Sequence, residues 1–367
     1  MTFKQIHRVL GLCAAVFWLV QVLTGLLLTF RQEIDNALVA GPRATVVTAA
    51  LGRRIESIQQ AGGHVSSLWV TNFPVDRFDL RYTDSNGVER LMRVDGAGRN
   101  LRDGLENAPF GNGGFFRTLT TIHTTLLLGD AGEWVIAVSG LLLISNLALG
   151  LKLAWPRGGR WRQALTWPST RNVTARVYGI HRAVGLWIAL PLLMVFAAGF
   201  LLCFADGVEQ ALGVVRPTPN IAAADTAGAG LSPGAGLSPG TGLSPGTGVS
   251  PARALDIALA RYPGSTLTAL SMPADKQAWY RVRVRAPGEV RRMYGTTTVF
   301  LSAATGAVLL EYPASTAPFV RFLYDAIYPL HTGELGGVAG RSLLAVLGLA
   351  LLTMGAFGMR LWLARRR

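Results

Sequence analysis

Five histidines are the residues of this chain best suited to carry chemistry, and four of them follow an internal repeat. His7 heads the apolar stretch 6–30, and His181 heads a matching stretch 174 residues later. His123, in HTTLLLGDAG, and His331, in HTGELGGVAG, each precede a further apolar stretch and match once one gap is allowed. Two imidazoles from two helices are what a six-coordinate haem iron requires. The spacing therefore predicts two ligand pairs, His7 with His181 and His123 with His331.

The repeat supports this pairing. Eleven of the 25 aligned positions in the first and third apolar stretches are identical without a gap. A pseudo-two-fold axis along the membrane normal would bring matched residues of two such halves together. Gly11 and Gly185 follow their histidines by one helical turn and would leave room for a porphyrin. Arg8 and Arg182 could bind its propionates through charge-assisted hydrogen bonds.

Simpler roles exist for each of these residues. A histidine at a membrane interface is often only a hydrogen-bonding residue, glycines in spans serve helix packing, and arginines beside spans set orientation. The ligand interpretation is favoured because four of the five histidines occupy matched positions, two for each membrane face. His64 has no counterpart and is interpreted as an ordinary loop or strand residue.

The composition indicates a membrane protein. Half of the residues are hydrophobic and only 15% are charged, against about 25% in soluble domains. Four runs reach the roughly 20 residues that a bilayer requires, and the first is too long to be a cleavable signal. The predicted spans are Val9–Phe30, Trp134–Trp155, Ala183–Phe204 and Ser342–Leu363.

The positive charges predict the orientation. The N-terminal segment, the link between the second and third spans and the C-terminal tail contain 13 of the 35 Lys+Arg and no Asp or Glu. The other 22 face 21 Asp+Glu, so nearly the whole net charge of +14 lies on one side. Cytoplasmic segments carry this excess, which places both termini inside and both large loops outside. Topology thus explains the high pI better than nucleic-acid binding does, and we expect no nucleic-acid partner.

The predicted fold is an α-helical membrane protein with four transmembrane helices in two tandem repeats. Each repeat includes a small extracytoplasmic α+β module, since short alternating strands and turn residues follow the first and third spans. A Gly-, Ser- and Pro-rich segment interrupts the second half as a flexible tether. The predicted boundaries are 1–30 (first span), 31–114 (module 1), 115–155 (histidine-bearing helix and second span), 156–180 (basic cytoplasmic link), 181–204 (third span), 205–251 (tether), 252–318 (module 2), 319–364 (histidine-bearing segment and fourth span) and 365–367 (basic tail).

The IHR at two span starts, HTTLLLGDAG, HTGELGGVAG and the α+β modules together resemble the PepSY-associated transmembrane family. Within it, the chain is similar to the ferric-siderophore reductases of the Gram-negative inner membrane. The resemblance implies two b-type haems, an inner one on His7 and His181 and an outer one on His123 and His331. It also implies PepSY-like periplasmic modules and an oxidoreductase activity that reduces siderophore-bound iron(III) and releases Fe(II). The long tether departs from the family pattern.

Other functions stay open on the sequence alone. The electrons would come from a quinol or a separate reductase, because no nucleotide or flavin domain is present in the sequence. One alternative is a non-catalytic, membrane-anchored interaction or regulatory protein of the PepSY type. Another is a quinol-oxidising cytochrome b subunit with a different acceptor. No carboxylates lie within the spans, which argues against an ion-coupled transporter.

Overall fold

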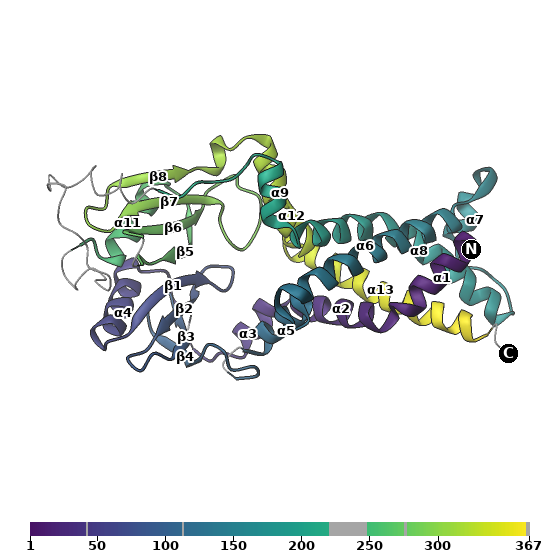
Figure 1. Cartoon of the computed structure of the whole chain (residues 1–367), viewed down its shortest axis with the longest axis horizontal. Helices are drawn as coiled ribbons and strands as arrows, with labels where there is room; N and C mark the ends of the chain where they lie inside the picture. The colour runs from purple at the N-terminus through teal and green to yellow at the C-terminus, as the bar shows by residue number, and fades with distance from the viewer. Residues whose placement is uncertain (42, 112–113, 220–247, 275–276, 365–367) are drawn as a thin grey trace. The chain divides into compact units, whose positions relative to one another are not determined.

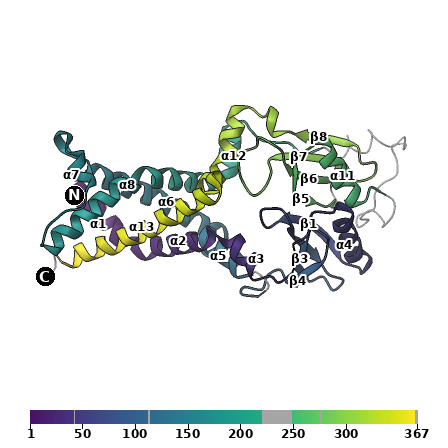
Figure 2. The same cartoon turned by 180° about the vertical axis from the view of Figure 1, so that it is seen from behind.

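The structure, a computed structural model, describes residues 1–41, 43–111, 114–219, 248–274 and 277–364. It divides into two compact units, each assembled from segments that are distant in the sequence (Figures 1 and 2). The helical unit comprises Met1–Arg31, Phe116–Ala211 and Ala326–Arg367, and the sheet unit comprises Gln32–Phe115 and Leu212–Asp325.

Three helical segments of the helical unit are long and apolar enough to cross a bilayer. They are α6 (Gly129–Ala154), α8 (Val173–Leu202) and the segment Glu334–Leu363, which joins the short η3 (Glu334–Gly336) to α13 (Gly337–Leu363). Their flanks expose large apolar side chains such as Trp187, as a lipid-facing helix does. The prediction of a multi-pass helical membrane protein is confirmed.

The first predicted span is not one straight helix. α1 (Phe3–Cys13) and α2 (Ala15–Leu28) meet at Ala14 with a bend of 63°, and they make a fourth span only if the pair counts as one. Neither proline nor glycine, the usual causes of a sharp kink, occurs at the break. Beyond it, the Trp18 indole donates a hydrogen bond of 3.1 Å to Ser139 Oγ, which fixes α2 against α6.

The spans form a ring in which each packs against two neighbours. α6 packs against α8, α8 against α13, α13 against α2, and α1 against α6. Ile188, Leu192 and Leu347 form a small buried core between α8 and α13. The shorter helices of the chain are α3 (Arg31–Ala37), α5 (Gly114–Thr125), η1 (Arg157–Gly159), α7 (Trp161–Leu165), α9 (Ala205–Ala211), η2 (Ala314–Thr316) and α12 (Phe319–His331).

The sheet unit is built on one antiparallel sheet of eight strands in the order β4-β3-β2-β1-β5-β6-β7-β8. α4 (Thr48–Gln60) and α11 (Pro251–Arg261) cover one face, where Leu51, Ile55 and Leu255 are fully buried. The strands are β1 (His64–Val70), β2 (Arg77–Thr83), β3 (Glu89–Asp95), β4 (Asn100–Leu105), β5 (Thr266–Ser271), β6 (Trp279–Arg285), β7 (Thr297–Ser302) and β8 (Val308–Tyr312).

The two predicted modules are therefore parts of a single sheet. β1 of the first pairs antiparallel with β5 of the second, and Leu68 lies opposite Leu270. Each strand would otherwise present an unpaired backbone edge to water. The helices meet as well, since a Cβ added to Gly52 of α4 would lie 2.6 Å from the Cβ of Ala252 in α11.

Other predicted boundaries changed or fall outside the described residues. The first residues of the predicted tether, 205–251, form helix α9, while its central part, 220–247, is not described. The tail 365–367 is likewise outside the described residues. The link 156–180 contains η1 and α7, and α8 begins within it at Val173.

Candidate functional site

The inner histidine pair joins α1 to α8. The ring centroids of His7 and His181 lie 6.5 Å apart, with an angle of 68° between the ring planes. Both side chains are half-buried in the helical unit. The structure thus brings together two residues that are 174 positions apart in the sequence.

The outer pair joins α5 to α12. The ring centroids of His123 and His331 lie 6.2 Å apart, at an interplanar angle of 39°. Each histidine lies in the last turn of its helix, shortly before α6 or α13 begins. The two pairs thus combine all four repeat-matched histidines, and His64 lies elsewhere, exposed at the start of β1.

Both separations fit two imidazoles on opposite sides of one metal ion. A metal–nitrogen bond of about 2.0 Å, as in other metal–histidine sites, with roughly 1.1 Å from nitrogen to ring centre, places trans ring centres about 6.2 Å apart. The centroid distances in the structure are 6.5 and 6.2 Å. The donor set also fits, since two histidines are one of the axial sets of haem iron. Within the described residues no three His, Cys, Asp or Glu side chains converge on a possible metal site, and axial ligation of haem requires only two.

Backbone carbonyls set the tautomer of two rings. His7 Nδ1 lies 3.0 Å from the carbonyl oxygen of Asn146, and His331 Nδ1 lies 2.9 Å from that of Val195. A carbonyl oxygen only accepts, so these contacts are hydrogen bonds only when Nδ1 carries the proton. Nε2 then keeps its lone pair, which is the arrangement that a metal-ligating histidine uses.

In the other two rings, those of His123 and His181, Nδ1 does not make an ordinary hydrogen bond to a backbone carbonyl. His123 Nδ1 lies 2.8 Å from Thr24 Oγ1, whose own proton is engaged by the Val20 carbonyl at 2.8 Å. Thr24 therefore accepts from His123 Nδ1–H. His181 interacts with the Met354 carbonyl, but its buried Nδ1 has no hydrogen bond of ordinary geometry.

A glycine on a neighbouring helix faces every one of the four rings. The distance from an added Cβ to the ring Cε1 would be 3.0 Å at Gly150 beside His7, 3.1 Å at Gly25 beside His123 and 2.6 Å at Gly199 beside His331. At Gly358, beside His181, it would be 3.9 Å. The first three distances are shorter than ordinary Cβ contacts, so only glycine admits these rings without a shift.

The carbonyl and the glycine form one recurring element. Asn146, Val195 and Met354 each lie one helical turn before the glycine that faces the same ring. The Gln21 carbonyl, one turn before Gly25, likewise interacts with His123. Four copies of one packing arrangement, two at each pair, indicate that the surfaces of the neighbouring helices hold the rings in place.

The profile of the PepSY-associated TM region matches residues 4–365, which include both pairs and the sheet unit. This chain belongs to the PepSY-associated TM family. The search of curated proteins found no match.

Gly11 and Gly185, which were predicted to leave room for a porphyrin, each lie one helical turn from an inner histidine and face a neighbouring helix. In this PepSY-associated TM protein, a Cβ on Gly11 would lie 3.7 Å from Asn146 Nδ2, and one on Gly185 would lie 3.1 Å from Met354 Cε. Gly11 thus faces Asn146, whose carbonyl accepts from His7 Nδ1, and Gly185 faces Met354, whose carbonyl interacts with His181. Arg182 Nε donates to the Ala154 carbonyl at 3.2 Å, and Arg8 is exposed.

The four ring-facing glycines were not predicted as site residues, although the sequence contains a signal for them. Gly25 and Gly199 are matched with each other in the alignment of the first and third apolar stretches. Gly150 and Gly358 are both separated by 27 residues from the outer histidine that precedes their span, His123 and His331. The alignment marks them as matched, but only coordinates show which helix face meets an imidazole.

The two pairs lie near opposite ends of the spans. On α8, His181 of the inner pair and Gly199, which faces the outer pair, are 18 residues apart. At 1.5 Å per residue this is about 27 Å of helix. The helical unit of this PepSY-associated TM protein thus has one pair of imidazoles near each end of its spans.

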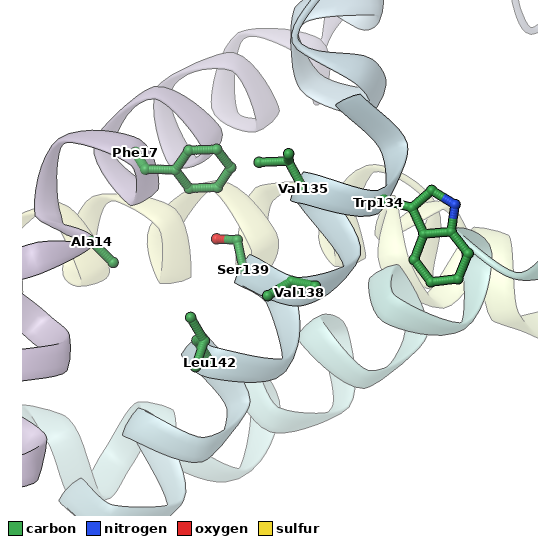
Figure 3. Close-up of a pocket in the computed structure, with 7 residues that line it drawn as sticks. All are labelled: Ala14, Phe17, Trp134, Val135, Val138, Ser139 and Leu142. Atoms are coloured by element: carbon green, nitrogen blue, oxygen red, sulfur yellow. The ribbon is translucent and has the colours of Figure 1, made fainter. Parts of the chain in front are cut away.

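A cavity of about 420 Å³ lies between the α1–α2 break and α6 (Figure 3). Its walls are almost entirely apolar, and the one hydroxyl, on Ser139, already accepts from Trp18. The cavity contains no titratable group and can therefore hold an apolar group but perform no acid–base chemistry. Its lining residues are Ala14, Phe17, Trp134, Val135, Val138, Ser139 and Leu142.

Proposed function

We propose that this PepSY-associated TM protein is a haem-b-dependent reductase of the bacterial inner membrane. It would pass electrons from the cytoplasmic side to an iron(III) chelate, such as a ferric siderophore, on the periplasmic side. The observation that carries the proposal is the grouping of four histidines into two pairs, each spaced for one metal ion, near opposite ends of the spans.

The residues around the pairs have specific parts in this proposal. His7 and His181 would hold the inner haem and His123 and His331 the outer one, and each haem would supply a one-electron iron(III)/iron(II) couple when bound. Asn146, Val195 and Thr24 accept the Nδ1 protons and so keep three Nε2 lone pairs available. Such outer partners orient ligands and tune the metal. The ring-facing glycines permit the close approach of the helices.

With a quinol as the electron donor, the electrons and protons of the proposed reaction balance. One quinol gives up two electrons and two protons, and each chelated iron(III) takes up one electron. Two chelates are therefore reduced for each quinol oxidised, and two protons are released. Reduction favours release because hard oxygen ligands hold the less charged Fe(II) less tightly.

Haem stoichiometry tests the cofactor. The purified full-length protein should contain two haems per chain and show a b-type spectrum after dithionite reduction. His7→Ala and His181→Ala should each lose the inner haem, and His123→Ala and His331→Ala the outer one. His64→Ala is the matched control, since this histidine is exposed on β1, and it should keep both. A preparation without haem from haem-supplemented cells would contradict the proposal.

Activity is tested separately, in vesicles that contain a reduced quinol. A ferric chelate added on one side should yield Fe(II), trapped by a ferrous-specific dye, and the rate should fall to the background in all four histidine variants. Bound haems with no reduction of any chelate would favour a cytochrome that serves another acceptor. A wild-type protein that neither binds haem nor reduces any chelate would favour a non-catalytic interaction protein.

A further inference from the structure

Three arginines lie side by side on the sheet face that is turned away from α4 and α11. Arg281, Arg283 and Arg285 alternate with Val282 and Val284 along β6. The valines are fully buried in the core, and alternate residues of a strand point to opposite faces. The arginines therefore share the other face, and all three are half-buried.

None of these three arginines forms an ion pair with any residue that the structure describes. Arg281 donates to Ser271 Oγ at 3.1 Å, and the guanidinium carbon of Arg285 lies 4.0 Å from the ring centre of Phe73. That of Arg283 lies 5.7 Å from the ring centre of Trp69, and its Nε is buried without a hydrogen-bond partner. A half-buried charge without a counterion is costly.

Further arginines increase the positive charge around Arg283. Arg216, Arg292 and Arg321 converge on one buried carboxylate, Asp325, with nitrogen–oxygen distances of 4.0, 3.8 and 3.0 Å. Burial, together with the charges of Arg281 and of these three arginines, lowers the pKa of Arg283 to about 10. The protonated guanidinium is thus destabilised where it lies, and a bound anion would relieve this.

The equivalent face of the first module is neutralised internally. β1 and β5 are equivalent strands, with the same irregularity after Val65 and after Leu267. Their partners on β2 and β6 are then equivalent too, and Asp79 occupies the position that Arg281 has in the second module.

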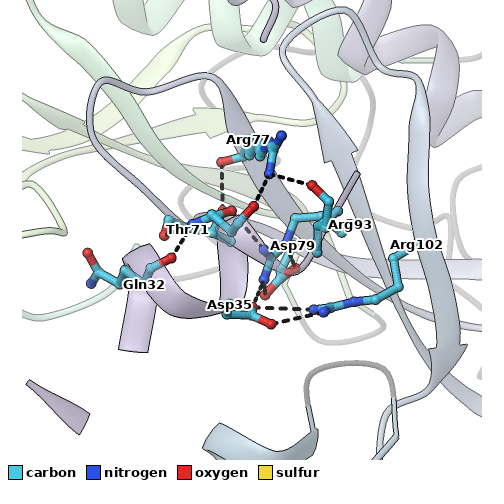
Figure 4. A network of polar contacts seen from close by, with 9 residues as sticks. Gln32, Asp35, Thr71, Arg77, Asp79, Arg93 and Arg102 are labelled. Atoms are coloured by element: carbon cyan, nitrogen blue, oxygen red, sulfur yellow. Dashed lines mark hydrogen bonds and ion pairs between the residues drawn. The ribbon is translucent and has the colours of Figure 1, made fainter. Parts of the chain in front are cut away.

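Around Asp79, Arg93 and Arg102 each have a carboxylate partner, whereas Arg77 donates to backbone carbonyls (Figure 4). Arg93 contacts Asp79 and also Asp35, at 2.7 Å, and Arg102 contacts Asp35 at 2.9 Å. Burial acts to lower the pKa of Arg93, but Asp79 and Asp35 outweigh it and raise the pKa above its ordinary value. The pKa values of Arg93 and Arg283 therefore shift in opposite directions. The first module thus supplies carboxylates to Arg93 and Arg102, whereas no described carboxylate lies within ion-pair distance of Arg281, Arg283 or Arg285.

We infer that the arginine face of β6, formed by Arg281, Arg283 and Arg285 with Trp69 and Phe73, binds negatively charged iron(III) chelates. This inference rests on the proposed reductase function, of which it would define the substrate class. Guanidinium forks bind oxyanions in bidentate fashion. Alternate residues of a strand are about 6.6 Å apart, so three guanidiniums can contact several oxygens of one chelate.

The chemistry of the face favours catecholate or carboxylate chelates. Iron(III) bound by doubly charged catecholates or by several carboxylates retains a net negative charge, whereas iron(III) bound by three hydroxamates is neutral. Aromatic side chains beside arginine also offer a surface on which flat catecholate rings can stack. A neutral chelate would leave the guanidiniums uncompensated, so the face should discriminate against it.

Binding can be measured without electron transfer, because gallium(III) has the charge of iron(III) but is not reduced under these conditions. Calorimetric titration of the full-length protein with a gallium(III) tris-catecholate should show one site, with affinity that falls as salt is added. Arg283→Gln and Arg281→Asp should each weaken binding about tenfold to hundredfold. Arg281→Asp reproduces the residue at the equivalent position of the first module.

Arg81→Gln is the matched control. Arg81 is the equivalent of Arg283 in the first module and already has a carboxylate, Glu106, at 3.2 Å. This variant should bind the gallium complex as the wild type does. A neutral gallium(III) trihydroxamate should bind at least tenfold more weakly than the tris-catecholate.

Several outcomes would overturn the inference. They are unchanged affinity in both arginine variants, equal affinity for the neutral complex, and equal affinity for metal-free citrate, which would indicate a general anion site. The proposed function can fail independently of this inference. Arginine-dependent binding by a protein that contains no haem would contradict the reductase function but support the binding site. If the arginine variants reduce the chelate at the wild-type rate, the arginine face is not the binding site but the reductase function stands.

Discussion

Gly199 of α8 faces the His331 ring of α12, and an added Cβ at Gly199 would lie only 2.6 Å from His331 Cε1. The same ring is held by its hydrogen bond to Val195, one turn earlier on α8. The backbone of α8 thus fixes both the position and the tautomer of His331.

Gly199→Ala should therefore displace the His331 ring. Overpacking of this kind costs about 1–3 kcal/mol, and we expect the outer haem to be lost or its reduction potential to change, while the inner haem is retained. Haem per polypeptide and a potentiometric titration measure both effects. Gly358→Ala is the control at the inner pair, because its Cβ would lie 3.9 Å from the His181 ring, an ordinary contact. Equal haem content and equal potentials in the two variants would contradict this account.

Thr24→Val should weaken the outer centre without removing a ligand. The change deletes the oxygen that accepts the His123 Nδ1 proton at 2.8 Å and keeps the side-chain volume. Loss of such an outer partner costs about 10- to 100-fold in metal affinity, so the outer haem should dissociate faster in a transfer assay. Thr29→Val removes a buried hydroxyl that, among the described residues, bonds only the Gly25 carbonyl, and haem release should stay at the wild-type rate. Identical rates in all three proteins would exclude a role for Thr24.

Asp35→Asn should destabilise the sheet unit in a pH-dependent way. Burial acts to raise the pKa of Asp35, but Arg102 and Arg93 outweigh it and hold the pKa below its usual value. The stabilisation is therefore complete above the unfolded pKa of about 3.9 and is lost as the pH falls through the lower folded value. We expect a loss of about 2 kcal/mol at pH 7.

Thermal unfolding of the full-length protein, followed by circular dichroism, measures this effect. The difference between wild type and Asp35→Asn should begin to shrink below about pH 4, where the Asp35 carboxyl of the unfolded chain takes up a proton, and it should continue to shrink down to the lower pKa of the folded protein. Asp256→Asn changes an exposed carboxylate that contacts only Thr48 in the described hydrogen bonds, and it should have little effect at any pH. A difference that is constant from pH 7 to pH 3 would show that charge does not matter at Asp35.

A disulfide should form across the junction of the two modules. Ser67 and Ser271 are directly opposed in the β1–β5 ladder, and opposed residues have Cα atoms within the range that a disulfide spans. In a chain without Cys13 and Cys203, Ser67→Cys with Ser271→Cys should oxidise in air and change mobility on a non-reducing gel. Ser67→Cys with Ser302→Cys is the control, since Ser302 lies two strands further on, in β7. Cross-linking in neither protein would mean that the modules are separate.

Local elements of this fold could be predicted from the sequence because their signals are local. Alternation along β6 and the turn residues between strands define strand positions, and the apolar runs define α6, α8 and α13. The pairing of β1 with β5 could not be predicted, because both strands have a partner within their own module and nothing in either sequence requires a third neighbour. The break at Ala14 could not be predicted either, because neither proline nor glycine occurs there.

The histidine pairs could be proposed from symmetry alone, but their surroundings could not. The sequence favoured Gly11 and Gly185 because they share a helix face with His7 and His181. The glycines that face the rings lie on neighbouring helices, and which faces meet depends on helix packing. The arginine face of β6 was also not predicted, because alternating arginines are typical of a solvent-exposed strand. Only a comparison with the first module in the structure shows that these arginines lack carboxylate partners.

The junction of β1 with β5 has a consequence for the newly made protein. Once the first module has left the ribosome, the outer edge of β1 has no neighbour until Thr266 and the residues after it have been synthesised. A bare edge recruits other strands, including those of a second nascent copy. A chaperone that shields β1 in this interval, or a fast rate of synthesis, would then decide how much of the protein escapes aggregation.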